Sequence, residues 1–324
     1  MPKAIRIYKH GGPEVMRWEE VEVGEPGAGE VRVRHTAIGL NLIDVYDRTG
    51  LYPLELPSGL GREAAGVIEA LGRGVRGFKR GDRVAYTYPQ AGAYAEVRVC
   101  PAERLVKIPP GISDPQAAAV MLKGLTAQYL VRQTYRVKRG DTVLIHAAAG
   151  GVGLLVSQWA RHLGAKVIGV VGNADKARLA KRNGCHHVIV GGPAELVAAV
   201  KSLTRGAGVN VVYDSIGKDT FQASLDCLRP LGMMVTFGNA SGPVPPVSPL
   251  ELSRRGSLFL TRPTLFHYIA TRPALERAAR ELFGAVKRGV IRIHIGQSYP
   301  LQDVATAHRD LEARRTTGST VLIP

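Results

Sequence analysis

The spacing of hydrophobic positions changes twice within residues 141–171, and these changes predict a strand, a helix and a second strand. Thr142–His146 is a short apolar run, and Lys166–Val171 is a second run rich in β-branched residues. Between them apolar residues recur at helical spacing, and Gly164 stands where a helix is expected to stop. The helical apolar positions are Val152, Leu155, Val156, Trp159 and Leu163. The pattern predicts one βαβ unit of about 30 residues.

A turn of small residues, 147–153, joins the first strand to the helix. It reads Ala148-x-Gly150-x-x-Gly153, so alanine replaces the first glycine of the dinucleotide-binding fingerprint. Glycines let the backbone approach a pyrophosphate, and the free N–H groups of a helix N-terminus bind it. The strand–turn–helix context favours a dinucleotide site. A tight turn that serves only the fold is the alternative.

The first third of the chain predicts short strands rather than a βα alternation. Apolar and polar residues alternate within 3–38, and further strands are predicted at 64–70, 83–86 and 94–99. This pattern indicates a compact, mostly antiparallel β region with a barrel-like arrangement.

Two helices with capping signals are predicted in the same region. Asn41 begins one, with Asp44 three residues later and Gly50 at its end. Ser113 and Gln116 form a second capping box before an alanine-rich helix, which residues 121–130 either continue or follow with another helix.

After residue 171 strands and helices alternate, which predicts a parallel, doubly wound sheet. The predicted helices are 175–182, 194–203 and 219–228, and the predicted strands are 187–190, 209–213, 233–237 and 257–261. The tail changes character, with a helix at 274–287, a strand near 291–295, a helix at 301–313 and a last strand at 320–323. We expect the tail to return to the first domain.

The end of the second strand of the βαβ unit indicates which nicotinamide cofactor is bound. Folds that bind a free ribose 2′-OH carry Asp or Glu there, whereas this chain has Val170-Val171-Gly172-Asn173. Lys176 and Arg178 follow, which favours a 2′-phosphate and hence NADPH over NADH. Asp175 could serve as that acid, but its position is better suited to capping the next helix. The alternative for Lys176 is an ordinary solvated lysine.

Length and composition limit the class of protein to which this chain can belong. The 324 residues suggest two domains, and 45% hydrophobic with 22% charged residues is typical of globular proteins. The N-terminus lacks the apolar stretch of a secretory signal, and the three isolated cysteines fit a reducing cytoplasm. The nine histidines lack ligand spacing, so we expect no metal site, and His146 is expected to be a packing residue.

The formal net charge of +16 would attract nucleic acid or anionic ligands. The positive residues are spread along the chain, with small clusters at 176–182 and 314–315. An arginine-rich composition is therefore favoured over a nucleic-acid interface.

Nine short motifs, in order along the chain, carry a family resemblance. They are His10–Val15, Gly39–Asp44, Arg48–Tyr52, Pro57–Gly61, Lys123–Thr126, His146–Gly153, Val212–Ser215, Phe237–Gly242 and Thr261–Pro263. With these motifs the whole chain resembles the zinc-independent quinone oxidoreductases, the zeta-crystallin-like branch of the medium-chain dehydrogenase/reductase superfamily. The zinc-dependent relatives carry Gly-His-Glu where this chain has Gly61-Arg62-Glu63, and a catalytic cysteine in the region of Gly39-Leu40-Asn41. The resemblance therefore implies no metal.

The resemblance also implies domains and a cofactor site. A Rossmann NADPH-binding domain would span 123–265, and a GroES-like catalytic domain would span 1–122 and 266–324. The nicotinamide side would be lined by Asn41, Ile43, Asp44, Tyr46, Thr126 and Tyr129. The pyrophosphate would meet Gly151 and Val152, and the adenosine 2′-phosphate and ribose would meet Gly172, Asn173 and Lys176. The rest of the site would comprise Ile216, Phe237, Gly238, Asn239, Ala240, Pro263, Leu265 and Arg314. Close relatives have a tyrosine at the adenine end, where this chain has Gly191.

The implied reaction is the reduction of a quinone or similar conjugated carbonyl by NADPH. The product oxyanion must be stabilised and protonated, and the candidate groups are Asn41, Tyr46 and Tyr52. Three alternatives to these catalytic roles remain open: Asn41 serves only as a helix cap, Tyr52 is only part of a turn, and a water molecule donates the proton. So do two other functions, an NADPH-dependent enone or alkenal reductase and a nucleic-acid-binding protein. Ser257–Thr261 is an apolar strand expected at the sheet edge, where two copies would pair as a homodimer unless the tail covers it.

Overall fold

The structure is a computed structural model that describes residues 1–324, and the chain divides into two compact units. Unit 1 contains residues 1–125, 269–287 and 293–324, and unit 2 contains residues 126–268 and 288–292. The chain therefore leaves unit 1 after its first third and returns to it. No helix is both long enough and apolar enough to cross a lipid bilayer.

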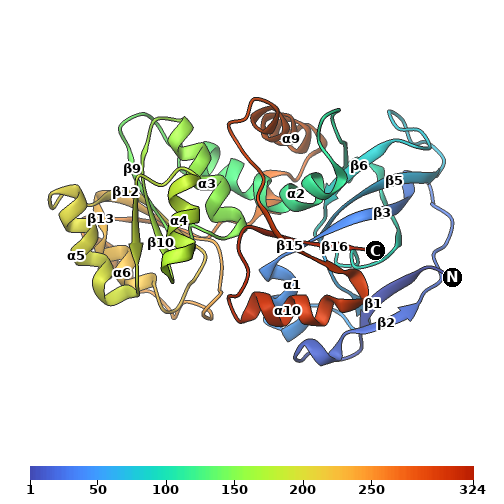
Figure 1. The fold of residues 1–324 in the computed structure, drawn as a ribbon, viewed down its shortest axis with the longest axis horizontal. Coiled ribbons are helices and arrows are strands. Elements are labelled where there is room, and N and C mark those ends of the chain that lie inside the picture. The colour runs from blue at the N-terminus through green and yellow to red at the C-terminus, as the bar shows by residue number, and fades with distance from the viewer. The chain divides into compact units, whose positions relative to one another are not determined.

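Unit 2 is built on a six-stranded parallel sheet with the order β11-β10-β9-β12-β13-β14. Its strands are β9 (Thr142–Ile145), β10 (Lys166–Val171), β11 (His187–Val190), β12 (Val209–Asp214), β13 (Leu228–Thr236) and β14 (Phe259–Thr261). Its helices are α3 (Gly151–His162), α4 (Ala174–Arg182), α5 (Pro193–Thr204), α6 (Phe221–Asp226), α7 (Pro249–Arg254) and α8 (Leu265–Tyr268). Figure 1 shows α3 and α4 running beside β10. This strand order confirms the predicted doubly wound sheet.

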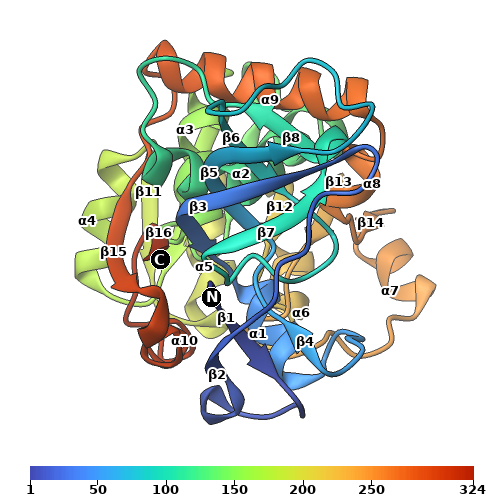
Figure 2. The ribbon, with the colours of Figure 1, turned by 90° about the vertical axis from the view of Figure 1, so that its right-hand side faces the viewer.

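Unit 1 consists mostly of antiparallel strands, as predicted. A seven-stranded sheet has the order β15-β16-β3-β5-β6-β8, with β7 also paired to β3, and a three-stranded sheet has the order β2-β1-β4. The strands are β1 (Lys3–Ile7), β2 (Arg17–Glu20), β3 (Glu30–Leu40), β4 (Ser58–Gly59), β5 (Glu63–Leu71), β6 (Arg83–Thr87), β7 (Val97–Pro101), β8 (Leu105–Lys107), β15 (Ile295–Pro300) and β16 (Ser319–Ile323). The helices are α1 (Leu42–Thr49), α9 (Arg272–Lys287), α10 (Val304–Glu312) and most of α2 (Asp114–Tyr129). Figure 2 shows α9 lying along β6 and β8.

The two predicted capping boxes are confirmed. The backbone N–H of Asn41 donates to Asp44 Oδ2 at 2.9 Å, and α1 ends at Gly50, whose φ is +81°. The Ser113 N–H donates to Gln116 Oε1 at 3.0 Å, and the Gln116 N–H donates to Ser113 Oγ at 3.3 Å. The helix that follows is continuous to Tyr129, so residues 121–129 extend it rather than start another.

Five predicted boundaries are wrong in detail. The strand expected at 233–237 is β13, which begins at Leu228 and ends at Thr236. The strand expected near 291–295 is β15, which begins at Ile295, because the N–H of Arg292 donates to the side chain of Gln158 at 2.7 Å instead of to a strand. The strand expected at 94–99 is β7, which begins at Val97. The helix expected at 219–228 is the shorter α6, and the strand expected at 257–261 begins at Phe259.

Candidate functional site

The turn between β9 and α3 brings backbone atoms so close together that it requires glycine. A Cβ on Gly153 would lie 2.3 Å from the carbonyl oxygen of Ala147. Ala147 itself has a φ of +48°, which turns the chain sharply after β9. No side chain caps α3, whose cap residue is Gly150. The first-turn N–H groups of Gly151 and Val152 are therefore available to an anion such as a pyrophosphate.

The sheet order reverses between β9 and β12, where parallel sheets bind ligands. Asp214, fully buried at the end of β12, holds the loop that follows. Its Oδ1 accepts from the N–H groups of Ile216 at 2.7 Å and Gly217 at 3.2 Å, and its Oδ2 accepts from Thr220 Oγ1 at 2.7 Å. Asp214 belongs to the motif Val212–Ser215, but nothing in that motif indicates that its carboxylate holds the next loop.

His146 supports the same loop through Ser224, which bonds to Asp214, and is a packing residue, as predicted. Ser224 Oγ donates to Asp214 Oδ2 at 3.3 Å, so it accepts from His146 Nε2 at 2.9 Å. The ring is 2% exposed, and burial lowers the pKa of His146. The imidazole is therefore neutral at pH 7 and faces the carboxylate through a hydroxyl.

The loop after β13 packs against the loop after β12. The N–H of Ala240 donates to the carbonyl of Ser215 at 3.2 Å, and a Cβ on Gly238 would lie 2.4 Å from the same oxygen. This contact brings Gly238, Asn239 and Ala240 close to Ile216. Three further predicted residues of unit 2 lie near strand ends: Phe237 is half-buried after β13, Pro263 is buried after β14, and Leu265 is buried at the start of α8. The last two are in α2, where Thr126 is buried and the ring of Tyr129 stacks on that of Tyr268, with centroids 4.3 Å apart.

The end of β10 carries no carboxylate. Asn173 is the cap of α4, and its Oδ1 accepts from the N–H of Lys176 at 2.9 Å. Asp175 was expected to be this cap, and that expectation is wrong because Asp175 lies inside the first turn and pairs with Arg178. A Cβ on Gly172 would meet nothing within 4 Å, so open space lies beside the strand end. Gly191 adjoins this site, since its N–H donates to the carbonyl of Val171 at 3.2 Å.

In unit 1 the candidate catalytic residues gather at α1. Asn41 caps the helix and is 5% exposed, and Tyr46 in the helix is 7% exposed. The ring of Tyr52 meets that of Tyr46 edge to face, with centroids 5.2 Å apart. Ile43 is half-buried in the same helix. Arg314 lies apart from them in the sequence, exposed after α10 with a φ of +58°.

Glu63, which the sequence analysis did not select, orients Asn41. Its carboxylate is fully buried and accepts from Asn41 Nδ2 at 2.8 Å, from the N–H of Leu122 at 2.5 Å and from Lys123 Nζ at 3.0 Å. Lys123 Nζ also donates to the carbonyl of Leu40 at 3.0 Å. Because an ionised carboxylate only accepts hydrogen bonds, the Asn41 side chain must turn its NH2 group, not its oxygen, toward Glu63.

Asp44 ends a directed chain of hydrogen bonds within unit 1. Arg48 donates to His308 Nδ1 at 2.9 Å, which leaves the proton on Nε2, 3.2 Å from the Tyr94 hydroxyl. Tyr94 in turn donates to Asp44 Oδ2 at 2.8 Å. Burial, and next the nearby charge of Asp47, raise the pKa of Asp44 to about 7. Its other oxygen is buried without a hydrogen-bond partner. The network places a carboxyl that titrates near neutrality beside the candidate catalytic residues of α1.

The geometry of both units agrees with the comparisons with known proteins. The alcohol dehydrogenase GroES-like domain matches residues 27–110, and the zinc-binding dehydrogenase model matches residues 151–283. A quinone oxidoreductase of Pseudomonas aeruginosa is 54% identical over 325 residues, with 100% of both chains covered. The chain belongs to the quinone oxidoreductase family. A 2-haloacrylate reductase of Burkholderia is 50% identical over 331 residues and covers 100% of this chain and 99% of its own.

A solved structure of this family supports the same assignment. The Escherichia coli quinone oxidoreductase complexed with NADPH has a TM-score of 0.96 and 49% identity, and the match covers 99% of this chain and 100% of that one.

The residues of this quinone oxidoreductase homologue do not fit the zinc that one family description mentions. No group of three or more His, Cys, Asp and Glu side chains is arranged to hold a metal ion. Arg62, at the position of the zinc-dependent relatives' histidine, binds Asp47 with two hydrogen bonds of 2.6 and 2.8 Å. Glu63 is occupied by Lys123.

Proposed function

We propose that this chain catalyses the NADPH-dependent reduction of quinones and related conjugated carbonyls. The observation that carries the proposal is the end of β10, where Gly172 and Asn173 stand in place of a carboxylate and Lys176 follows. The nearby Asp175 pairs with Arg178. A carboxylate there would repel a 2′-phosphate, whereas a lysine attracts it. The full-length kinship with quinone oxidoreductases supports the same activity.

When bound, NADPH supplies the reducing electrons. Gly151 and Val152 offer their N–H groups to the pyrophosphate, and Asp214 keeps the neighbouring loop of Ile216 in place. We propose that Asn41 and Tyr46 orient the reacting carbonyl and that Tyr52 donates the proton. The remaining predicted binding residues keep the roles given above, in domains of 1–122 with 266–324 and of 123–265.

The decisive experiment measures cofactor oxidation in the presence of a simple quinone. We expect turnover with NADPH to exceed turnover with NADH, and a chelator to leave the rate unchanged. A rate that depends on the quinone but not on the identity of the cofactor would contradict the role of Lys176. Tyr52→Phe with almost unchanged turnover would remove the tyrosine as proton donor.

A second candidate function is the reduction of an activated carbon–carbon double bond. The 2-haloacrylate reductase relative, at 50% identity over the full chain, supports it. A panel of quinones, enones and haloacrylates at fixed NADPH separates the two. The better substrate class is the one with the higher kcat/KM.

We propose a homodimer formed through β14. This strand is the last of its sheet, and Phe259 and Leu260 are 56% and 36% exposed. Exposed apolar sheet edges favour pairing with a second chain. Gel filtration of Phe259→Lys tests this interface, and an unchanged dimer would argue against it.

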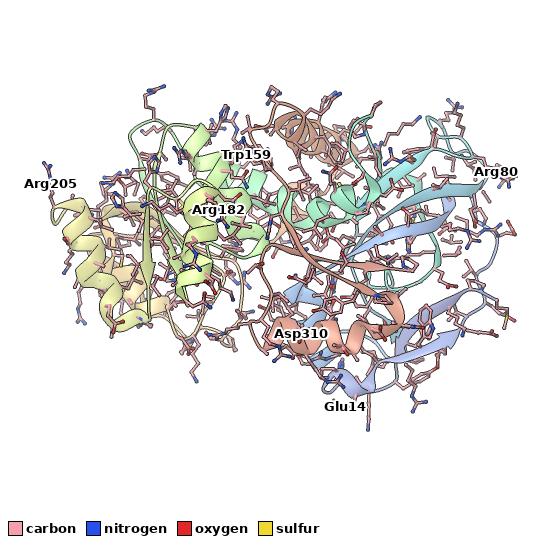
Figure 3. All side chains as sticks on the ribbon, in the orientation of Figure 1. Glu14, Arg80, Trp159, Arg182, Arg205 and Asp310 are labelled. Atoms are coloured by element: carbon pink, nitrogen blue, oxygen red, sulfur yellow. The ribbon has the colours of Figure 1, made fainter.

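We also propose a cytoplasmic location, which the three buried free cysteines support. Nucleic-acid binding remains the alternative from another class. Within unit 2, the exposed Arg182 ends α4 and the exposed Arg205 follows α5, so these two arginines lie on different elements (Figure 3). Titration with single-stranded RNA at rising salt tests it, and we expect no steep salt dependence.

A further inference from the structure

Unit 1 contains a cavity of about 900 Å³ that none of the predicted cofactor or substrate residues lines. It is lined by Gly29, by the connection between β5 and β6, by residues of β8 and of the chain on both sides of it, and by one face of α9. Figure 2 shows α9 lying along β6 and β8. We call it the α9 pocket. Its volume is in the range of pockets that bind small organic ligands.

The floor of the α9 pocket is apolar. The lining residues of α9 lie on one face of the helix, because they recur at intervals of three and four positions. They are Arg272, Glu276, Ala279, Arg280, Phe283, Gly284 and Lys287. Phe78, Val75 and Val106 complete the apolar surface. On another face of α9, Leu282 packs so closely on α2 that a Cβ on Gly124 would lie 2.6 Å from it. The helix is therefore held in place while the pocket face stays open.

The rim carries more positive than negative charge. Two of its cations are neutralised within the protein, since Lys107 Nζ lies 2.9 Å from Asp82 and Arg272 Nε lies 2.7 Å from Glu276. The remaining acid of the lining, Glu103, pairs with Arg104 at 3.3 Å.

The other three rim cations, Arg76, Arg280 and Lys287, have no carboxylate within ion-pair distance. All three are exposed, so an anion that enters the pocket can contact them.

We propose that the α9 pocket binds a small organic anion that joins an acidic group to an apolar body. The acidic group contacts Arg280, Lys287 and Arg76, where charge-assisted hydrogen bonds are available. The apolar body lies on Val75 and Phe78, which are half-buried and leave hydrophobic surface from which it displaces water. This site shares no lining residue with the proposed NADPH and quinone residues. Its test rests on the proposed function only in using NADPH to block the nucleotide site and quinone reduction to check the fold.

The test uses 8-anilinonaphthalene-1-sulfonate as the anion, with its uncharged analogue N-phenyl-1-naphthylamine for comparison. Fluorescence titrations are carried out with saturating NADPH, so that the nucleotide site is blocked. The pocket variant is Arg280→Gln/Lys287→Gln. The matched control is Arg277→Gln/Arg80→Gln, which removes the same charge from α9 and from the β5–β6 connection at two exposed residues that do not line the pocket.

We expect the pocket variant to bind the sulfonate at least about tenfold more weakly, as the loss of one charge-assisted hydrogen bond produces. The control should bind it like the unmodified chain, and the uncharged analogue should bind all three alike. Equal weakening in both variants, no weakening in either, or loss of all sulfonate binding on adding NADPH would each overturn the proposal. Quinone reduction by all three chains at the same rate shows that the folds are intact.

Discussion

Two lysine–carboxylate pairs of unit 1 have nearly the same length and different burial, and this difference yields a sharp prediction. Lys123 Nζ lies 3.0 Å from Glu63, and the two side chains are 8% and 0% exposed. Lys107 Nζ lies 2.9 Å from Asp82, with exposures of 55% and 12%. Replacing each lysine by methionine removes the same charge and keeps a similar length of apolar side chain.

Lys123→Met leaves the Glu63 carboxylate buried without its cation, whereas Asp82 in the control remains close to solvent. Breaking a buried ion pair costs about 3–5 kcal/mol. The N–H of Leu122 and the Asn41 amide still donate to Glu63, which places the expected loss near the lower end, about 3 kcal/mol. Lys107→Met should cost less than about 1 kcal/mol, as exposed pairs do.

Urea unfolding measures both losses. Unit 1 contains Trp18 and unit 2 contains Trp159, so a Trp159→Phe background leaves Trp18 as the single tryptophan reporter. Because both lysine variants share that background, its own cost cancels. Equal losses for Lys123→Met and Lys107→Met, with unchanged denaturant slopes, would refute the argument that burial sets the strength of these pairs.

Three more changes test other parts of the molecule. Gly172→Asp, at a position open within 4 Å, should lower the ratio of kcat/KM for NADPH to that for NADH by at least about tenfold, and an unchanged ratio in steady-state assays would contradict the assignment of this strand end. Gly153→Ala forces a Cβ to 2.3 Å from the Ala147 carbonyl and should cost about 2 kcal/mol or more, whereas Gly150→Ala, with 3.2 Å, should cost less, and urea unfolding ranks them. Burial raises the pKa of Asp44 from 3.8 to about 7, so at pH values between these two Asp44 is protonated in the folded chain and ionised in the unfolded chain. Its contribution to the free energy of unfolding therefore falls by about 1.4 kcal/mol per pH unit as the pH rises through that window. Asp44→Asn should remove this slope, and parallel pH–stability curves for the two chains would disprove the shift.

Local signals in the sequence were sufficient for the elements that support the site. The capping pairs Asn41 with Asp44 and Ser113 with Gln116 act over three positions, so their residue types alone predict where α1 and α2 begin. The βα alternation likewise predicted the parallel sheet, because each strand and helix is defined by its own periodicity. The strand expected near 291–295 begins only at Ile295, because the backbone N–H and carbonyl of Arg292 bond to the side chain of Gln158, which is distant in the sequence.

The buried polar groups that organise the site escaped prediction for the same reason. Glu63 meets Lys123 across 60 positions, and Ser224 meets His146 across 78. Neither spacing leaves a periodic trace in the sequence. A buried carboxylate is recognised as an organising group only after the fold has shown which donors surround it.

The hydrogen bonds that join the residues farthest apart in the sequence explain why the C-terminal segment belongs to unit 1. Arg48, in α1, is fully buried, and its guanidinium reaches His308 at 2.9 Å and Glu312 at 2.6 Å, both on α10 and more than 250 positions away. A buried guanidinium without an anionic partner is costly, so α1 requires α10 to be stable. The same helix α1 carries Asp44 and Tyr46 and begins at Asn41, so the return of the chain completes the environment of the proposed catalytic residues. The tail therefore acts on the site through α10 in two ways. Glu312 and His308 hold Arg48, and His308 also lies 3.2 Å from the Tyr94 hydroxyl, which donates to Asp44.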